Sequence, residues 1–189
     1  MATIVYLHGF GSNNQTEKVG FLKEAFPGHR VIAPNIPAHA LEAYLTIDKF
    51  IEQELERTAG QVILIGTSLG GFWARMFAAK FNLESIVMNP SLNPAVTLKR
   101  YAGGKNNCRV DGWTEADAEG YTRLPTRLLE TCKGTILLEE GDEILDSVAT
   151  YNKYNGTNET ILIPGGEHRF VHLDILQEKI QEIIENAVF

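Results

Sequence analysis

The stretch Gly66-Thr67-Ser68-Leu69-Gly70 has the pattern G-x-S-x-G and joins two segments of different character. The apolar run Val62-Ile63-Leu64-Ile65 precedes it, and the helix-like stretch Phe72-Trp73-Ala74-Arg75-Met76-Phe77 follows it. A serine at a sharp turn from a strand into a helix is typical of the nucleophile elbow of serine hydrolases. Such a turn strains the backbone at the serine and leaves little room for flanking side chains, which accounts for the two glycines. Ser68 is therefore the candidate nucleophile.

Short apolar runs alternate with longer amphipathic segments on both sides of this stretch. Runs rich in Ile, Val and Leu predict strands at Thr3–Leu7, Arg30–Ala33, Gln61–Ile65, Ser85–Met88, Thr135–Leu138 and Thr160–Ile163. Apolar residues spaced three and four apart predict helices at Glu17–Phe26, Leu41–Arg57, Gly71–Phe81, Ser147–Tyr154 and Leu173–Ala187. The alternation predicts an α/β fold, in which a parallel sheet of about six strands carries helices on both faces.

The connection between Pro90 and Lys133 is long, at about 40 residues. A connection of this length in a compact domain usually forms a lid or binding loop, or contains small helices. We expect a small helical or loop insertion at about residues 91–133, over the site. A chain of 189 residues with 44% hydrophobic content is too short for two ordinary domains, so we expect one domain over residues 1–189.

Charge and composition exclude several classes of function. The formal net charge of −7 argues against a nucleic-acid partner or an anionic membrane surface, because both need clustered Lys and Arg. Met1-Ala2-Thr3 leads directly into a predicted strand without a signal-peptide core, and no apolar stretch approaches the roughly 20 residues of a membrane helix, so we expect a cytoplasmic protein. Cys108 and Cys132 lack metal-type spacing, which favours free thiols.

The loops that follow the predicted strands carry the residues of acyl-transfer chemistry. Ligands of an open parallel sheet bind outside the carboxyl ends of its strands, so these loops are considered together. They are His8-Gly9-Phe10-Gly11-Ser12, the Ser68 stretch, Glu139-Glu140-Gly141-Asp142 and Pro164-Gly165-Gly166-Glu167-His168. Their serine, aspartate and histidine follow the chain order of α/β-hydrolases.

His168 is the candidate base, because a free serine hydroxyl is hardly ionised near neutral pH and needs one. It follows the last strand and a Gly-Gly pair that lets the loop fold over the sheet edge. The remaining histidines lack this setting. His8 stands beside the loop after the first strand and is expected to be structural, and surface or packing roles are expected for His29, His39 and His172.

The acid that orients His168 is either Asp142 or Asp146. Asp142 stands nearest the end of the fifth strand, which places its carboxylate at the same edge of the sheet and favours it. Asp146 immediately precedes the predicted helix Ser147–Tyr154, where its simplest role is helix N-cap. The oxyanion of the reaction needs two backbone N–H donors, which we assign to Leu69 of the elbow and Phe10 of the first loop.

Gly9-Phe10-Gly11 after a first strand is also compatible with a dinucleotide-binding fingerprint. In that pattern a third glycine is required where Asn14 stands, and the second strand ends in Ile32-Ala33-Pro34-Asn35 without the acid that would bind ribose. Nucleotide binding is therefore not expected, and we expect neither a metal nor an organic cofactor.

Five blocks of the sequence together resemble the small bacterial α/β-hydrolases called the YqiA/YcfP-like family. The blocks are Tyr6-Leu7-His8-Gly9-Phe10, Gly66-Thr67-Ser68-Leu69-Gly70-Gly71, Asn89-Pro90, Gly141-Asp142-Glu143-Ile144-Leu145-Asp146 and Gly165-Gly166-Glu167-His168-Arg169-Phe170. The resemblance implies a minimal α/β-hydrolase fold, which begins at what larger relatives count as their third strand, and esterase activity on short acyl esters. By position, it implies a triad of Ser68, Asp142 and His168.

The sequence thus predicts a serine carboxylesterase whose substrate is a small acyl ester. A thioesterase or an acyltransferase would use the same residues and stays open as an alternative. A non-catalytic binding or scaffold protein with a hydrolase fold is the alternative from another class, although it would be expected to lose at least one of Ser68, Asp142 and His168.

Overall fold

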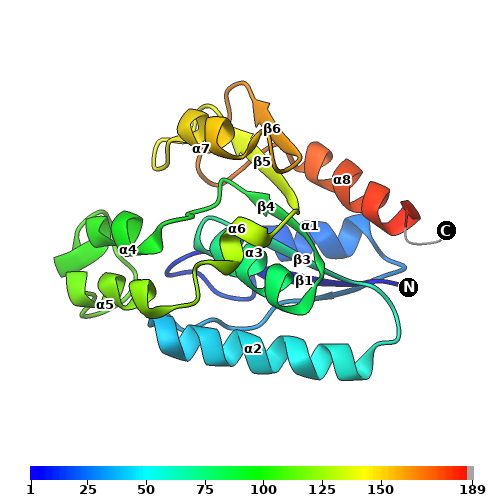
Figure 1. Cartoon of the computed structure of the whole chain (residues 1–189), viewed down its shortest axis with the longest axis horizontal. Coiled ribbons are helices and arrows are strands. Elements are labelled where there is room, and N and C mark those ends of the chain that lie inside the picture. The colour runs from blue at the N-terminus through cyan, green and yellow to red at the C-terminus, as the bar shows by residue number, and fades with distance from the viewer. Residues whose placement is uncertain (187–189) are drawn as a thin grey trace.

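The computed structural model describes residues 1–186 and contains one six-stranded sheet, in the order β2-β1-β3-β4-β5-β6 (Figure 1). Every neighbouring pair of strands is parallel, as predicted. The strands are β1 (Thr3–Leu7), β2 (Arg30–Ile32), β3 (Val62–Thr67), β4 (Glu84–Met88), β5 (Thr135–Glu139) and β6 (Thr160–Ile163). From β1 the chain adds β2 on one side and β3 on the other, so a topological switch point lies between β1 and β3. Ligand sites of open α/β sheets form at such points, outside the carboxyl ends of the strands.

Helices cover both faces of the sheet, which confirms the predicted fold class. The longer helices are α1 (Glu17–Ala25), α2 (Ala40–Arg57), α3 (Leu69–Phe81), α7 (Ser147–Tyr154) and α8 (Leu173–Asn186). Side chains of α2 and α3 form one hydrophobic core with one face of the sheet, and side chains of α1 and α8 form a second core with the other face. The predicted end of the last helix, at Ala187, lies outside the described residues.

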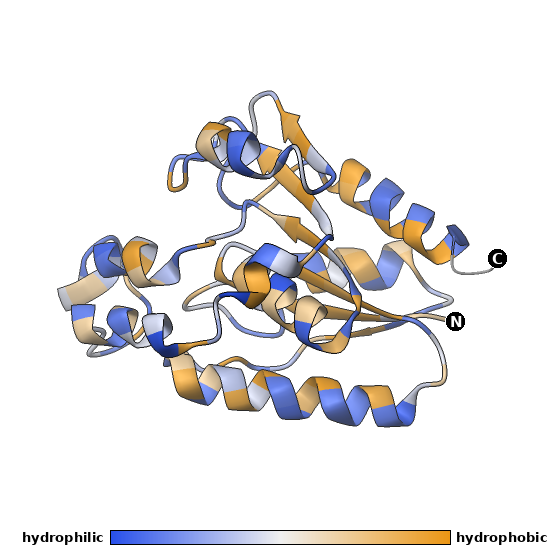
Figure 2. Cartoon of the chain, viewed as in Figure 1, coloured by the Kyte–Doolittle hydropathy of each residue, from blue (hydrophilic) through white to orange (hydrophobic). Residues whose placement is uncertain are grey.

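Both faces of the central strands are buried, which explains their nearly continuous apolar sequences. Along β1, Ile4 and Tyr6 belong to the core with α1 and α8, while Val5 and Leu7 belong to the core with α2 and α3. Figure 2 shows the contrast between the mostly hydrophobic strands and the mixed surfaces of α2 and α8. None of the helices within residues 1–186 has the length and apolar character required to cross a membrane.

The insertion at residues 91–133, predicted to be helical or a loop, combines both: five short helical elements are joined by loops. The elements are α4 (Pro94–Thr97), the 3-10 helix η1 (Leu98–Gly104), α5 (Glu115–Glu119), the 3-10 helix η2 (Gly120–Arg123) and α6 (Leu128–Thr131). Elements α4 and α5 project beyond the carboxyl ends of the strands, at the left of Figure 1. Two buried aromatic side chains attach the insertion to the rest of the molecule. Trp113 packs on Phe10 with ring centroids 4.6 Å apart and donates its Nε1 proton to the Leu98 carbonyl within the insertion at 3.1 Å, and the Tyr121 hydroxyl donates to the Ala38 carbonyl at 2.8 Å.

The turn at Ser68 is tighter than the sequence predicted. Strand β3 continues through Gly66 and Thr67, because these residues still pair with β1 and β4, and α3 begins at Leu69 instead of Gly71. The other predicted ends of helices and strands within residues 1–186 agree with the structure to within one residue. The chain therefore passes from strand to helix at Ser68 alone.

Candidate active site

Ser68 has a strained backbone, with φ 56° and ψ −122°. A non-glycine residue in such a region costs about 1–3 kcal/mol and persists only where its surroundings fix it. Here the Ser68 N–H donates to the Met88 carbonyl at 3.1 Å, and the Ser68 carbonyl accepts from the N–H groups of Gly71 and Ser91, both at 2.9 Å. Hydrogen bonds to α3, to the last residue of β4 and to the segment that follows β4 thus hold the serine in place.

The two glycines of the motif are sterically required. A Cβ on Gly66 would overlap the carbonyl of Gly70, and a Cβ on Gly70 would overlap the carbonyl oxygen of Leu7 in β1. In both cases the obstruction is backbone, which cannot rotate away as a flexible side chain could. The packing of α3 directly against β1 and β3 therefore explains both glycines.

Ser68, His168 and Asp142 come together through hydrogen bonds. The Ser68 Oγ lies 2.9 Å from His168 Nε2, and His168 Nδ1 lies 2.9 Å from both carboxylate oxygens of Asp142. The Asp142 side chain is fully buried, while 12% of the His168 side chain is exposed. A hydroxyl, an imidazole and a buried carboxylate in this order form the arrangement that can activate a serine as a nucleophile.

The two candidate acids differ in what they contact. Asp142 Oδ1 also accepts from the N–H groups of Ile144 at 2.8 Å and Leu145 at 2.9 Å, which fixes the carboxylate beside His168. Asp146 is the N-cap of α7, and its Oδ1 accepts from the Ala149 N–H at 2.8 Å. The carboxylate that reaches His168 is therefore that of Asp142.

Asn89, which follows β4, connects the end of β5 to the His168 loop. Its Oδ1 accepts from the Glu139 N–H at 2.8 Å, and its Nδ2 donates to the carbonyls of Glu167 at 2.9 Å and His168 at 3.3 Å. The His168 N–H donates to Glu143 Oε2 at 2.9 Å. Neither Asn89 nor Glu143 is among the site residues predicted from the sequence. The Asn89-Pro90 pair directly after a predicted strand was the available signal.

Glu139, the last residue of β5, is a fully buried acid that is likewise not among the site residues predicted from the sequence. Its carboxylate accepts from the backbone N–H groups of Glu167 at 2.7 Å, Val171 at 2.8 Å and His172 at 3.0 Å, and it lies 2.6 Å from His172 Nδ1. Burial alone would raise the pKa of Glu139, but these donors outweigh burial and lower it. Glu139 thus organises the His168 loop, and His172 has a specific partner instead of the surface or packing role expected for it.

His8 has the structural role that the sequence indicated. It is buried, its Nε2 accepts from the Ile36 N–H at 3.0 Å, and its Nδ1 lies 2.9 Å from the Gly9 carbonyl. Since Ile36 can only donate and Gly9 can only accept, the ring is neutral with its proton on Nδ1. Burial lowers the pKa of His8, in keeping with the neutral form. His8 therefore ties the loop after β1 to the segment after β2.

The loop after β1 lies directly against Ser68. A Cβ on Gly9 would be 3.5 Å from the Ser68 Cβ and 4.0 Å from its Oγ. The N–H groups of Phe10 and Leu69, the predicted oxyanion donors, form no hydrogen bond within residues 1–186. Two N–H groups free to donate beside a serine can stabilise a developing negative charge.

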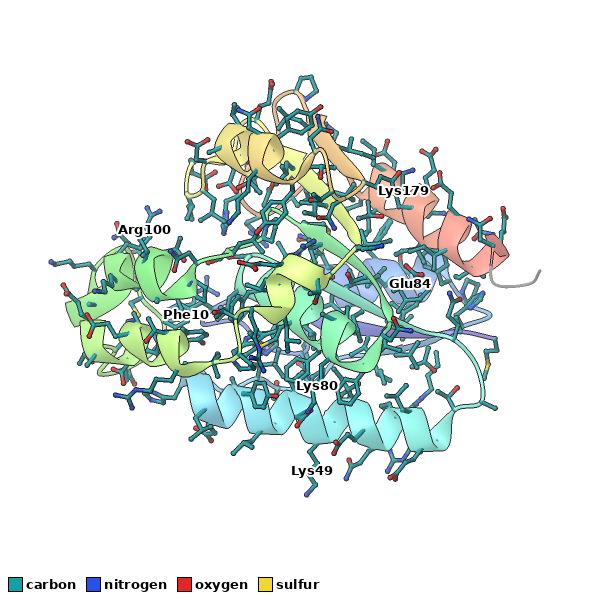
Figure 3. The ribbon with its side chains drawn as sticks, viewed as in Figure 1. Phe10, Lys49, Lys80, Glu84, Arg100 and Lys179 are labelled. Carbon is teal, nitrogen blue, oxygen red and sulfur yellow. The ribbon has the colours of Figure 1, made fainter. Side chains whose placement is uncertain are left out.

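A cavity of about 320 Å³ opens above Ser68 and His168. Apolar side chains from the first loop, the insertion and the loop after β5 form much of its wall: Phe10, Leu98, Tyr101, Ile144 and Leu145. Phe10 stacks on Tyr101 with a ring-centroid distance of 5.2 Å, and Figure 3 shows it where the insertion meets the rest of the molecule. In the described part of the chain, no cluster of three or more His, Cys, Asp or Glu side chains is arranged to hold a metal ion.

Solved structures of α/β-hydrolases resemble this fold over nearly the whole chain. Est1E from Butyrivibrio proteoclasticus has a TM-score of 0.77 at 15% identity, with 99% of this chain and 88% of Est1E covered. Alpha/beta hydrolase domain-containing protein 10 from mouse has a TM-score of 0.68 at 18% identity, covering 97% of this chain and 90% of the mouse protein. A thermophilic esterase from Thermogutta terrifontis has a TM-score of 0.63 at 16% identity, covering 99% and 90%. These likenesses confirm the α/β-hydrolase fold.

Relatives with similar sequences confirm the resemblance inferred from the five sequence blocks. The UPF0227 proteins YcfP of Salmonella gallinarum (strain 287/91 / NCTC 13346) and of Escherichia coli O9:H4 (strain HS) are both 25% identical to this chain over 183 residues. In each case the match covers 94% of this chain and 96% of the relative. The sequence model of one family matches residues 3–187. The chain therefore belongs to the Uncharacterised protein family (UPF0227).

Proposed function

We propose that this protein is a serine carboxylesterase that hydrolyses esters with short acyl chains. The observation that carries the proposal is the continuous hydrogen-bonded chain from Ser68 through His168 to Asp142, at a strained strand-to-helix turn. Strain of this kind at a polar residue is costly, and it concentrates at sites where function requires it. The thermophilic esterase from Thermogutta terrifontis, whose fold is similar, supports the same class of reaction.

In the proposed reaction, Ser68 Oγ attacks the ester carbonyl while His168 Nε2 takes its proton. Asp142 holds the imidazole in the tautomer with a proton on Nδ1 and stabilises the imidazolium that forms. The N–H groups of Phe10 and Leu69 bind the oxyanion of the tetrahedral intermediate. The alcohol then leaves with the proton from His168, and a water molecule releases the acyl group by the same steps.

The cavity supports small substrates, because about 320 Å³ is near the lower end for ligand pockets. Rates with p-nitrophenyl esters from acetate to palmitate test this, and we expect kcat/KM to fall as the acyl chain outgrows the cavity. Preference for palmitate would overturn the short-chain assignment. An acyl-CoA thioester in the same panel distinguishes an esterase from a thioesterase with the same residues.

Ser68→Ala is the control that separates an enzyme from a non-catalytic hydrolase-fold protein. The wild-type chain is expected to react with a fluorophosphonate probe and to turn over p-nitrophenyl acetate, and the variant to do neither. If the folded wild type shows neither labelling nor turnover above Ser68→Ala, the proposed function is wrong.

A further inference from the structure

The cavity above Ser68 has a charge opposite to that of the whole chain. Its wall includes three basic side chains, Lys18, Arg109 and Arg169, and one acidic side chain, Glu17. The formal net charge of the chain is −7, so an excess of cations in this one place does not follow from composition. Charges of one sign in a cleft with low-dielectric walls attract ligands of the other sign.

The three cations reach the cavity from three separate segments. Lys18 is the second residue of α1, and Arg169 directly follows His168 in the loop after β6. Arg109 comes from the insertion, where its Cβ would lie 3.2 Å from a Cβ on Gly11 of the first loop. The charges of Arg169 and Glu167 act on Lys18, which places Lys18 with Arg169 on the His168 side of the cavity, while Arg109 lies beside the first loop.

The positive charges are weakly compensated. Lys18 forms no hydrogen bond or ion pair within residues 1–186, and Arg169 reaches only Glu17, at 3.7 Å between two side chains that are 74% and 82% exposed. An exposed ion pair at this distance contributes little stabilising free energy, so Glu17 neutralises the charge of Arg169 only weakly. The pKa of Lys18 is lowered, mainly by burial and then by the neighbouring Arg169 guanidinium. The carboxylates of Glu17, Glu139 and Glu167 would raise this pKa, but their effect is smaller. An anion bound between Lys18 and Arg169 would compensate the Lys18 ammonium group for its lost hydration and would offset its repulsion from Arg169.

We infer that the preferred substrates are esters whose leaving group carries a negative charge, which Lys18 and Arg169 bind. The inference rests on the proposed esterase function and adds the chemical class of the substrate. His168 must lie beside the leaving oxygen in order to protonate it, and Arg169 is its neighbour in the chain. The apolar side chains of Leu98 and Tyr101 are then left for the acyl group.

Two pairs of matched esters test the inference. The pair 4-acetoxybenzoate and methyl 4-acetoxybenzoate differs in charge on the leaving group, and the pair mono-4-nitrophenyl succinate and 4-nitrophenyl butyrate differs in charge on the acyl group. The readout is the ratio of kcat/KM for the charged ester to that for the neutral ester. We expect Lys18→Met and Arg169→Gln each to lower this ratio about five- to tenfold for the first pair, with little change for the second.

Lys23→Met is the matched control, because Lys23 is exposed on the same helix α1 and is absent from the cavity wall. It removes the same charge and should leave both ratios unchanged. Unchanged ratios in Lys18→Met and Arg169→Gln would overturn the inference. A ratio that falls only for the second pair would show that Lys18 and Arg169 bind a charged acyl group instead of a charged leaving group, and would also overturn it. The neutral esters distinguish a failure of the proposed esterase function from a failure of the inference about leaving-group charge. If wild type does not hydrolyse the neutral esters faster than Ser68→Ala, the proposed esterase function is wrong, and so is the inference that rests on it.

Discussion

Replacing Asp142 by asparagine exchanges one oxygen for an NH₂ group and should reverse the hydrogen bond to His168. Asp142 Oδ1 accepts from the N–H groups of Ile144 and Leu145, at 2.8 and 2.9 Å, and only an amide oxygen can keep these two bonds. The NH₂ group then takes the position of Oδ2, 2.9 Å from His168 Nδ1. An NH₂ group can only donate, so it would face a proton on Nδ1, while Oδ1, which also lies 2.9 Å from Nδ1, already accepts two backbone bonds. The favoured tautomer therefore has Nδ1 as the acceptor and the ring proton on Nε2. In this tautomer His168 cannot accept the proton of Ser68.

We expect Asp142→Asn to lose much of its kcat and little of its free energy of unfolding. The corresponding asparagine variant of a serine protease, with its geometry intact, loses about 10⁴ in kcat through the wrong tautomer. We expect a similar loss here, equivalent to about 5 kcal/mol of activation free energy. The two surviving backbone bonds should keep the loss in unfolding free energy near 1 kcal/mol. Rates of p-nitrophenyl acetate hydrolysis measure the first quantity, and urea denaturation followed by circular dichroism measures the second.

Asp146→Asn is the matched control, since asparagine caps a helix about as well as aspartate. Asp146 contacts the N–H of Ala149 at the start of α7, so its variant should keep kcat within about twofold. If a folded Asp146→Asn loses most of its kcat while Asp142→Asn keeps it, the assignment of the acid is wrong. A folded Asp142→Asn with nearly full activity would refute the tautomer argument itself.

Further predictions concern the framework of the site. Glu139→Gln should lower the free energy of unfolding by about 2–4 kcal/mol, because the buried donors of the His168 loop lose a charged acceptor; urea denaturation at pH 7 measures this. Since the folded-state pKa of Glu139 lies below its usual 4.5, its stabilisation is complete above about pH 4.5 and disappears as pH falls through the folded-state pKa. The urea midpoint of wild type should therefore fall more steeply than that of Glu139→Gln in this acidic range. Gly70→Ala should lower Tm or prevent folding, because its Cβ would overlap the Leu7 carbonyl, while Gly20→Ala, with open space around its Cβ, should raise Tm slightly.

The sequence predicted the sheet and helices well because their apolar patterns are local. Where it erred, long-range pairing was responsible. Gly66 and Thr67 have the residue types of a turn, yet the neighbouring strands β1 and β4 extend β3 through them. The length of the insertion predicted a helical or loop segment over the site, but not how this segment packs, because Trp113 and Tyr121 contact residues distant in the sequence.

The site residues that could be predicted are those that directly follow a strand in a recognisable motif. Ser68, Asp142 and His168 satisfy this condition, and parallel strands bring such positions to one edge of the sheet. Asn89 and Glu139 also end or follow strands, but their partners are backbone N–H and carbonyl groups of a loop much later in the chain. Backbone partners leave no residue type to recognise, so these contacts were not predictable from the sequence, and only the position of Asn89-Pro90 directly after a predicted strand pointed to the site.

These missed residues matter because of the order of the strands. Ser68 follows β3 and His168 follows β6, which are separated by three strand spacings, or about 14 Å. The loop after β6 must therefore cross back over the ends of β5 and β4 before His168 can reach the serine. Glu139 binds this loop at the end of β5, and Asn89 binds it just after β4, one anchor for each strand crossed. The sheet thus sets the distance between Ser68 and His168 through the side chains of Asn89 and Glu139. Weakening either should misplace the base, although neither side chain forms a hydrogen bond with the His168 imidazole.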